Sequence, residues 1–530
     1  MSNDLENLTT LIAAKKNSMG VAKHAMVAAC HPQSTAIGLA VLKSGGSAVD
    51  SFIATTFAEY VLAPGTTSMA GELSLLVYNS AEKESLYLHG GFKTPQLFKG
   101  KDSLNAGNSI LIPGAIAGLE AAHSKFGRLP WEKLIEPAIN LANDGFEISP
   151  LYEDILHSRH PLLKKSPYAC HTFFKDGEPL KQGDYLCQPT VAQTLERIAS
   201  EGSTFFYKGD WAKAFIEAVR KHGGNISLED MAAYKPLWVP AWKTHYKDNE
   251  VHSTNLPAYG GIKVALGLKL LEYFNLGERK HWSVSSDSLE LMIRIARFIE
   301  SGHWLYGNNA LNEYLAQGQI PDEYISALAE EIYNPIQPNY ALLKGTHSYH
   351  IIVVDQDGNI ASGTHTIGSL PWGDYGIFVG GVPLTSAGIY ASQTPGEFIP
   401  DPFSIHFALQ NNSPILAVGT FASSMFPADL QILSNLLDFK MSPEEAILTP
   451  RFGTFVHNFH TMPISVDTTK NFLDKRIPVF MVSYLKSRGI QVEQEGFVDT
   501  GMGVVVQIQN SPRQLYGMTP EFLDGVAKGY

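Results

Sequence analysis

The chain has 530 residues, with 40 Lys and Arg against 52 Asp and Glu, which gives a formal net charge of −12 at pH 7. Its 44% hydrophobic and 11% aromatic content is typical of a globular protein with a sizeable core. The acidic balance, without any basic run, argues against nucleic acid and anionic membrane surfaces as partners. No segment approaches the ~20 apolar residues of a transmembrane helix. The first 20 residues lack a basic stretch followed by an apolar run, so we expect a cytoplasmic protein.

Metal and cofactor motifs are missing from the sequence. The three cysteines show neither paired nor metal-ligand spacing. Two histidine pairs, His157 with His160 and His347 with His350, are not part of an HExxH motif. No P-loop and no nucleophile elbow of the G-x-S-x-G type occurs. We therefore expect no disulfide framework, no metal site and no cofactor.

The first half of the chain favours helices. The apolar pattern over 34–42 ends at Gly45 and Gly46, and two glycines after an apolar helix are typical of a helix C-terminus. Ser227 before Glu229 and Asp230 predicts a capped helix start. The further predicted elements are helices over 48–60, 115–127 and 130–146 and strands over 73–78 and 85–89.

The stretch from 345 to 366 predicts a hairpin. Residues 351–354 are consecutive β-branched residues, typical of a strand buried on both faces. Residues 355–359 form a turn signal in which Gly358 can take a positive φ, and 360–366 returns as the second strand.

Strands and helices alternate after this hairpin. The predicted elements are a strand over 413–420, helices over 428–437 and 442–448, and strands over 504–508 and 514–517. No linker and no repeat separates the two halves of the chain. The sequence therefore predicts one interwoven α+β domain over residues 1–530.

A hydroxyl-rich patch, Thr346-His347-Ser348, precedes the first strand of the hairpin. A Ser or Thr whose own α-amino group is freed by cleavage carries its general base with it, because an α-amine has a pKa near ~8. Thr364 or Thr366 on the returning strand can supply polar contacts to such a nucleophile. Taken alone, the pattern favours a loop that leads into a strand over a nucleophile.

A series of segments along nearly the whole chain resembles the γ-glutamyltranspeptidase family, N-terminal-nucleophile enzymes made as precursors that cut themselves into large and small subunits. The segments are GLAVLKSGGSAVD (38–50), LIPGAIAGLEAAHSKFGRLPWEKLIEPAINLANDGFEIS (111–149), FYKGDWA (206–212), GGNISLEDMAAY (223–234), VVDQDGN (353–359), EEAILTPRF (444–452) and the final GY. The resemblance implies an α+β fold, the αββα four-layer sandwich, with the hairpin near its centre. It also implies a heterodimer of self-cleaved fragments, a large fragment of residues 1–347 and a small fragment of residues 348–530.

The family's nucleophile, usually Thr, lies seven residues before the Asp of V-x-D-x-x-G-N. Counting back seven from Asp355 gives Ser348, and serine can perform the same chemistry without the methyl group that restricts its rotamers. Thr346 stays an alternative, which requires two extra residues between it and the strand. The family's hydroxyl partner on the second strand matches Thr366.

The charged substrate contacts of the family are altered here. The arginine that binds the substrate α-carboxylate falls at Gly91. Lys93 can offer a cation close by, but as a point charge without the bidentate guanidinium. Glu397 is the candidate for the family's amine-binding acid, in a region where the alignment slips.

The polar contacts of the family are altered as well. Its oxyanion-hole pair of glycines corresponds to Ala422 and Ser423, whose backbone N–H groups serve only if the backbone follows the same path. Its paired serines are reduced to Ser404.

These departures define the expected function. A buried charge without a partner costs several kcal/mol, so ordinary glutathione turnover is not expected without the arginine. The resemblance implies a divergent amidohydrolase or acyltransferase, self-cleaving before Ser348 or Thr346, that acts on a small-molecule amide other than a plain γ-glutamyl one. A variant of this hypothesis is an enzyme that is not cleaved and that uses His347 or His350 as its base. The alternative is a non-catalytic relative that keeps the fold for binding or assembly.

Overall fold

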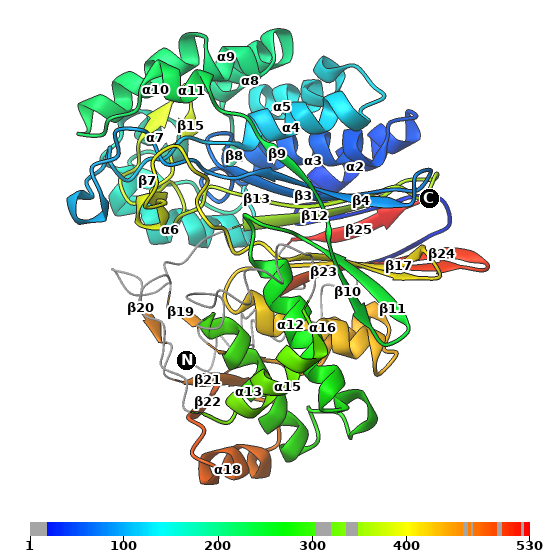
Figure 1. Ribbon diagram of the computed structural model, residues 1–530. Coiled ribbons are helices and arrows are strands. Elements are labelled where there is room, and N and C mark those ends of the chain that lie inside the picture. Colours follow the sequence, from blue (N-terminus) through cyan, green and yellow to red (C-terminus); the bar gives the residue numbers. More distant parts are fainter. Residues whose placement is uncertain are drawn as a thin grey trace. The chain divides into compact units, whose positions relative to one another are not determined.

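The computed structural model describes residues 18–302, 320–334, 348–454, 456–458, 465–467, 470–495, 501–520 and 524–530. The chain forms two compact units, each assembled from segments that are distant in the sequence (Figure 1). The first unit combines Met1–Val239, Thr346–Asp401 and Arg513–Tyr530, and the second combines Pro240–Gly345 with Pro402–Pro512. Each unit is thus interwoven along the chain. The expectation of one domain over 1–530 stays a prediction.

The first unit is built on an antiparallel sheet with the strand order β25-β2-β12-β13-β3-β4-β9. The strands, in the order of the chain, are β2 (Met26–Ala29), β3 (Glu72–Asn79), β4 (Glu84–Gly90), β9 (Leu237–Pro240), β12 (Ser348–Val354), β13 (Ile360–Thr366) and β25 (Val526–Gly529). Outside this sheet, β1 (Met19–Ala22) pairs with β24 (Arg513–Met518). The predicted strands 73–78 and 85–89 are confirmed as β3 and β4, which pair with one another.

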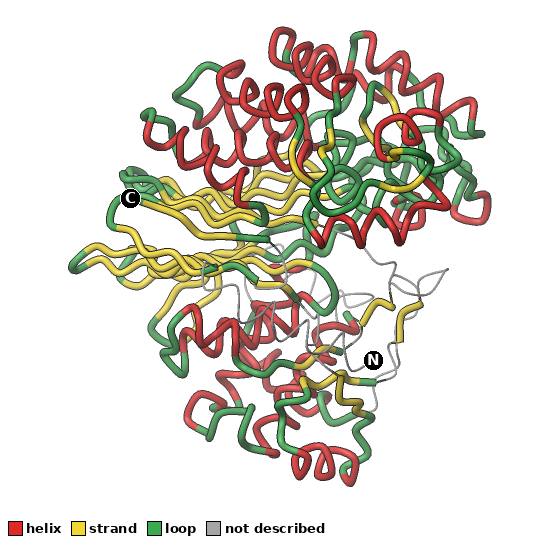
Figure 2. The backbone as a smooth tube through the Cα atoms, turned by 180° about the vertical axis from the view of Figure 1, so that it is seen from behind, coloured by secondary structure: helices red, strands yellow, loops and turns green. Residues whose placement is uncertain are grey.

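Helices cover one face of this sheet, and Figure 2 shows them as a layer beside the strands. The helices in contact with its strands are α2 (Pro32–Lys43), α3 (Ala48–Leu62) and α4 (Ala115–Phe126). The further helices of the first unit are α5 (Trp131–Asp144), α6 (Pro150–Leu163), α7 (Pro167–Phe173), α8 (Pro189–Glu201), α9 (Ser203–Tyr207), α10 (Asp210–Lys221) and α11 (Leu228–Ala232). Every residue of α3 is buried, and a capping box between Ser47 and Asp50 starts this helix. In the middle of β13, a Cβ on Gly363 would lie 2.5 Å from Phe52 Cζ of α3. This glycine therefore allows α3 to pack directly on the sheet.

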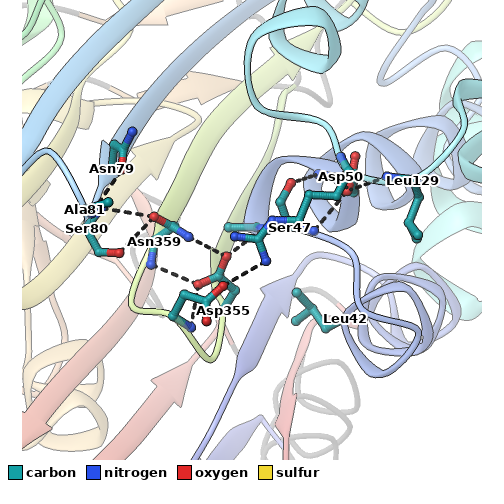
Figure 3. Close-up of polar contacts among 12 residues, drawn as sticks. Leu42, Ser47, Asp50, Asn79, Ser80, Ala81, Leu129, Asp355 and Asn359 are labelled. Atoms are coloured by element: carbon teal, nitrogen blue, oxygen red, sulfur yellow. Dashed lines mark hydrogen bonds and ion pairs between the residues drawn. The ribbon is translucent and has the colours of Figure 1, made fainter.

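The predicted hairpin is confirmed. Ile351 to Val354 are fully buried in β12, and β12 pairs with β13 in a regular register from Ser348 opposite Thr366 to Val354 opposite Ile360. The Asp355 carboxylate closes the turn, because it accepts hydrogen bonds from the backbone N–H groups of Asp357 and Asn359 at 3.0 and 2.9 Å (Figure 3).

Asp355 also anchors the turn to α3. Its Oδ2 accepts from the backbone N–H of Ala48, the first residue of α3, at 3.1 Å, and from the Asn359 amide at 2.9 Å. Burial nevertheless raises the pKa of Asp355, and these hydrogen bonds only reduce that shift. Asp355, the first Asp of the VVDQDGN segment, thus fixes where β12 lies relative to α3.

The second unit contains antiparallel strands in the order β23-β17-β16-β11-β10. The bounds are β10 (Trp242–Tyr246), β11 (Asn249–Ser253), β16 (Ile405–Gln410), β17 (Ser413–Phe421) and β23 (Met502–Asn510). Its helices are α12 (Gly260–Tyr273), α13 (Ser286–Ser301), α15 (Asp322–Glu331), α16 (Met425–Leu437), α17 (Pro443–Leu448) and α18 (Val479–Ser487). A smaller sheet joins β18 (Phe452–Gly453), β21 (Asn471–Asp474) and β22 (Val492–Glu495). Among the helices of the described ranges, none is both long and apolar enough to cross a membrane.

Candidate active site

The first unit carries a row of polar side chains across three neighbouring strands. Ser348, the first residue of β12, lies directly opposite Thr366 of β13, and Thr366 lies directly opposite Glu72 of β3. Directly paired residues place their side chains on the same face of a sheet. All three are buried, with exposed fractions of 6%, 1% and 5%. Two of the predicted catalytic residues, Ser348 and Thr366, are therefore neighbours, whereas Thr346 and His347 lie outside the described residues.

Thr366 is held at the end of its strand by the turn that follows. Its Oγ1 accepts a hydrogen bond from the backbone N–H of Gly368 at 3.0 Å, and Gly368 has a φ of +70° that favours glycine. The Thr366 side chain is thus fixed beside Ser348 rather than free to rotate.

His350 occupies the next row on the same face. Its Nδ1 lies 2.8 Å from Thr364 Oγ1 and its Nε2 lies 2.9 Å from Ser362 Oγ, and its side chain is fully buried. Both ring nitrogens are therefore engaged with hydroxyl groups of β13. This arrangement gives His350 the role of joining β12 to β13, and it disfavours His350 as the base of an unprocessed enzyme.

The opposite face of the same strands carries a buried cluster. His365 Nε2 lies 2.7 Å from Glu59 Oε2 of α3, and both side chains are fully buried. Glu59 Oε1 accepts from the backbone N–H of Cys30 at 3.2 Å and from Ser34 Oγ at 3.0 Å. The cluster ties β13, α2 and α3 together on the face of the sheet opposite the side chains of Ser348 and Thr366.

Sequence reasoning missed an acidic cluster at the third position of the polar row. Burial, and then the neighbouring Asp401 carboxylate, raise the pKa of Glu72 well above its usual value. Asp401 Oδ2 lies 3.0 Å from His89 Nδ1. The available signal was a charged residue at the head of an otherwise apolar strand, in ELSLLVY, but only the pairing register shows that Glu72 shares a row with Ser348.

Lys93 and Glu397 lie close to one another in the first unit. The ammonium group of Lys93 sits over the Phe398 ring at 4.3 Å from its centroid, and Lys93 also forms an antiparallel bridge with Phe398. Burial lowers the pKa of Lys93, while the Glu397 charge opposes this shift. Glu397 itself is exposed. Lys93 and Glu397, both predicted to contact the substrate, thus form one local group with Phe398.

In the second unit, Ala422 and Ser423 form the turn between β17 and α16. Ala422 has a φ of +71° and Ser424, the residue before α16, has a φ of +53°. Left-handed backbone costs an L-residue about 1–2 kcal/mol, and such strain clusters at functional sites. The turn therefore keeps a glycine-like path without glycine, and it presents backbone N–H groups at the start of a helix.

Ser404 is fully buried and contacts His406, whose Nε2 lies 2.8 Å from Ser404 Oγ. On its other nitrogen, His406 Nδ1 lies 2.7 Å from Ser253 Oγ, and Asp429 Oδ2 lies 3.5 Å from His406 Nε2. The four side chains join β11, β16 and α16 inside the second unit. Within the described ranges, no three His, Cys, Asp or Glu side chains are grouped so as to hold a metal ion.

Comparison with known proteins gives these residues a family context. The gamma-glutamyltranspeptidase family model matches residues 34–379. The glutathione hydrolase proenzyme of Escherichia coli (strain K12) is 27% identical over 96% of this chain and 92% of its own length. The capsule biosynthesis protein CapD proenzyme of Bacillus anthracis is 31% identical over 67% of this chain and 64% of its own length.

Solved structures agree with the sequence match. The crystal structure of cephalosporin acylase from Bacillus halodurans superimposes with a TM-score of 0.82 over 97% of each chain, at 22% identity. This likeness confirms the α+β fold of the N-terminal-nucleophile hydrolases, the αββα sandwich expected from the sequence. By name, the relatives are glutathione hydrolases and acylases, which supports an amide hydrolase or acyltransferase. Because the family model spans more than half of its residues, the chain belongs to the gamma-glutamyltranspeptidase family.

Proposed function

We propose that this protein is an amide hydrolase or acyltransferase that cuts its own backbone before Ser348 and then uses the Ser348 hydroxyl as nucleophile. The observation that carries the proposal is the position of Ser348 at the head of a buried strand, directly opposite Thr366. A nucleophile at the end of a rigid, fully packed strand is held in a fixed geometry, as efficient attack requires. The proenzyme names of the relatives support self-processing.

The self-cleavage step is an acyl shift. Ser348 Oγ attacks the carbonyl carbon of residue 347, so that a C–O bond forms and the C–N bond before Ser348 breaks. The hydroxyl proton goes to the departing nitrogen, which becomes the new α-amine. Water then hydrolyses the ester, which leaves a carboxyl terminus on the large fragment (residues 1–347) and a free amino terminus on the small fragment (residues 348–530).

The mature enzyme then uses this α-amine as its base. With a pKa near ~8, the amine accepts the Ser348 hydroxyl proton while Oγ attacks the substrate carbonyl, and it returns the proton to the departing amine. The acyl group remains on Ser348 as an ester until water or a second amine takes it. Thr366, which lies directly opposite Ser348 on the neighbouring strand, would orient the Ser348 hydroxyl.

The substrate is an amide other than a plain γ-glutamyl one. Gly91 supplies no cation for an α-carboxylate, and a side chain added at Gly91 would collide with the His89 ring. Lys93, the nearest alternative, directs its ammonium group over an aromatic ring. An ordinary glutathione donor would therefore leave its carboxylate without the partner that the family provides.

Matched alanine variants test the proposal. Wild type should yield two fragments on a denaturing gel, Ser348→Ala should stay as one chain, and Thr346→Ala should still be cut. Ser348→Thr should restore cleavage, since threonine keeps the hydroxyl. If Ser348→Ala is cut while Thr346→Ala is not, Thr346 is the nucleophile. If wild type stays whole and no nitrophenyl ester or nitroanilide in a broad panel is turned over, the non-catalytic alternative holds.

A further inference from the structure

The first unit carries a groove of about 650 Å³ between α10 and the start of α11. The two helices pack against one another and lie side by side in Figure 1. Cavities of this size are typical of sites that bind small organic molecules. The proposed reaction does not account for the groove, because neither Ser348 nor Thr366 lines it. The lining residues are Lys213, Ile216, Glu217, Arg220 and Lys221 of α10 and Leu228 and Glu229 of α11.

The groove has an apolar floor. Ile216 of α10 is buried, with 4% of its surface exposed, whereas Leu228, the first residue of α11, keeps 39% exposed. A single exposed leucine on a protein surface needs no explanation. Leu228, however, shares a concave surface with Ile216, so an apolar group in the groove would cover both side chains.

Three cations surround this floor. Arg220 and Lys221 follow Lys213 by seven and eight positions on α10, so the three side chains lie on one face of the helix. Lys213 Nζ donates to Asp210 Oδ1 at 2.9 Å. The side chains of Arg220 and Lys221, in contrast, form no ion pair and no hydrogen bond with any other described residue. A planar guanidinium with free N–H groups is suited to bind a carboxylate through two parallel hydrogen bonds.

Two carboxylates limit the charge that the groove accepts. Glu217 precedes Arg220 and Lys221 by three and four positions, the spacing at which ion pairs commonly form on a helix. Nevertheless, the side chains of Glu217 and Glu229 form no ion pair and no hydrogen bond within the described part of the chain. A phosphate group, with about −1.5 to −2 charges at pH 7, would be repelled by both carboxylates much more strongly than a single carboxylate would be. The groove therefore favours a ligand with one negative charge.

We propose that the groove between α10 and α11 binds an organic monocarboxylate with an apolar chain, with the carboxylate at Arg220 and Lys221 and the chain over Ile216 and Leu228. The carboxylate supplies the acceptors that the two cations lack among the described residues. The chain covers the exposed part of Leu228, and the removal of this apolar surface from water stabilises the complex. This site is independent of the proposed function, because no step of that reaction uses a lining residue.

Calorimetry on the full-length protein tests the site with octanoate as the probe. At pH 7, octanoate should bind at least ~5-fold more tightly than 1-octanol, as expected for a charge-assisted contact at an exposed position. It should bind at least ~10-fold more tightly than butyrate, because each additional methylene group that leaves water contributes to the affinity. Inorganic phosphate should not compete. Equal affinity for octanoate and 1-octanol, or for octanoate and butyrate, would overturn the inference.

Substitutions in the groove show where octanoate binds. Arg220→Gln should weaken octanoate binding by ~5-fold, and Leu228→Ser should weaken it by ~3-fold or more. The matched control is Lys208→Gln, which removes an exposed cation just before α10 that does not line the groove. All three positions are exposed, so the variants should fold like wild type. If Arg220→Gln and Leu228→Ser both bind octanoate as wild type does, the acid binds elsewhere and the proposal is wrong.

Neutral replacements of the two carboxylates should act in the opposite direction. Glu217→Gln and Glu229→Gln should each tighten octanoate binding by ~2-fold or more, because each removes a charge that repels the ligand. Weaker octanoate binding in both variants would contradict the assigned position of the carboxylate. None of these measurements requires turnover, so they decide the site whether or not the chain is cut before Ser348.

Discussion

The buried Glu59–His365 contact predicts strong energetic coupling between α3 and β13. The pair joins Glu59 Oε2 to His365 Nε2 at 2.7 Å with both side chains fully buried. Removing one partner of such a pair leaves the other polar group buried and unsatisfied, which costs about 3 kcal/mol or more. We therefore expect Glu59→Leu and His365→Phe each to lower the thermal midpoint by about 5–10 °C.

The double variant should lose much less stability than the sum of the losses in the two single variants. In Glu59→Leu/His365→Phe, only the Cys30 N–H loses its acceptor entirely, because Ser34 Oγ also bonds to the His31 carbonyl at 2.9 Å. Phenylalanine can keep the edge contact that His365 makes with the Tyr60 ring. The expected coupling energy is therefore about 2 kcal/mol in favour of the double variant.

The assay is a double-mutant cycle on thermal midpoints in a Ser348→Ala background, which is expected to keep the chain whole. The Glu153–His157 pair, at 3.7 Å, with an exposed His157 and a half-buried Glu153, is the control, and it should show coupling below ~0.5 kcal/mol. Additive effects of Glu59→Leu and His365→Phe would refute the reasoning, since they would mean that the two side chains do not depend on one another.

Three further predictions concern single positions. Gly363→Ala should lower the thermal midpoint, because the new Cβ meets the Phe52 ring of α3, and a midpoint equal to wild type would contradict this packing. Ala422→Gly should raise stability by up to about 1 kcal/mol and Ala422→Val should lower it, since φ is +71° at this turn; the reverse order in denaturant unfolding would show that the strain is not there. Burial lowers the pKa of His31 to about 4, so the unfolded chain binds the proton first and stability is lost as pH falls from about 6.5 through 4. His31→Asn keeps an acceptor at this helix start and should flatten the acid dependence of the thermal midpoint, whereas an unchanged profile would assign it to other groups.

The sequence predicts the hairpin well because its signals are local. Four consecutive β-branched residues define the buried strand, and the turn at 355–359 fixes the register that places Ser348 opposite Thr366. The capped helix starts at Ser47 and Ser227 are likewise set by neighbouring residues. Local chemistry of this kind is readable from a single sequence.

The remainder of the site depends on contacts between distant segments. Glu72 and Asp401 are 329 positions apart (401 − 72 = 329), and their proximity follows from the order of strands, which no local pattern specifies. As an alanine, Ala422 does not favour a left-handed backbone, yet it adopts the path that glycine favours, because the β17–α16 turn overrides this local preference. Ser404, predicted to contact substrate, is buried against His406. The sequence does not predict this contact, because it depends on how β16 packs.

The most direct test of the central claim is the identity of the residue that begins the small fragment and carries the acyl group. The purified wild-type protein is measured by intact mass and, after brief exposure to an acylating nitrophenyl ester, by tandem mass spectrometry of the new amino terminus. The account predicts fragments 1–347 and 348–530, with the acyl group on Ser348. A single whole chain without label, or a fragment that begins at Thr346 and is labelled there, would contradict it.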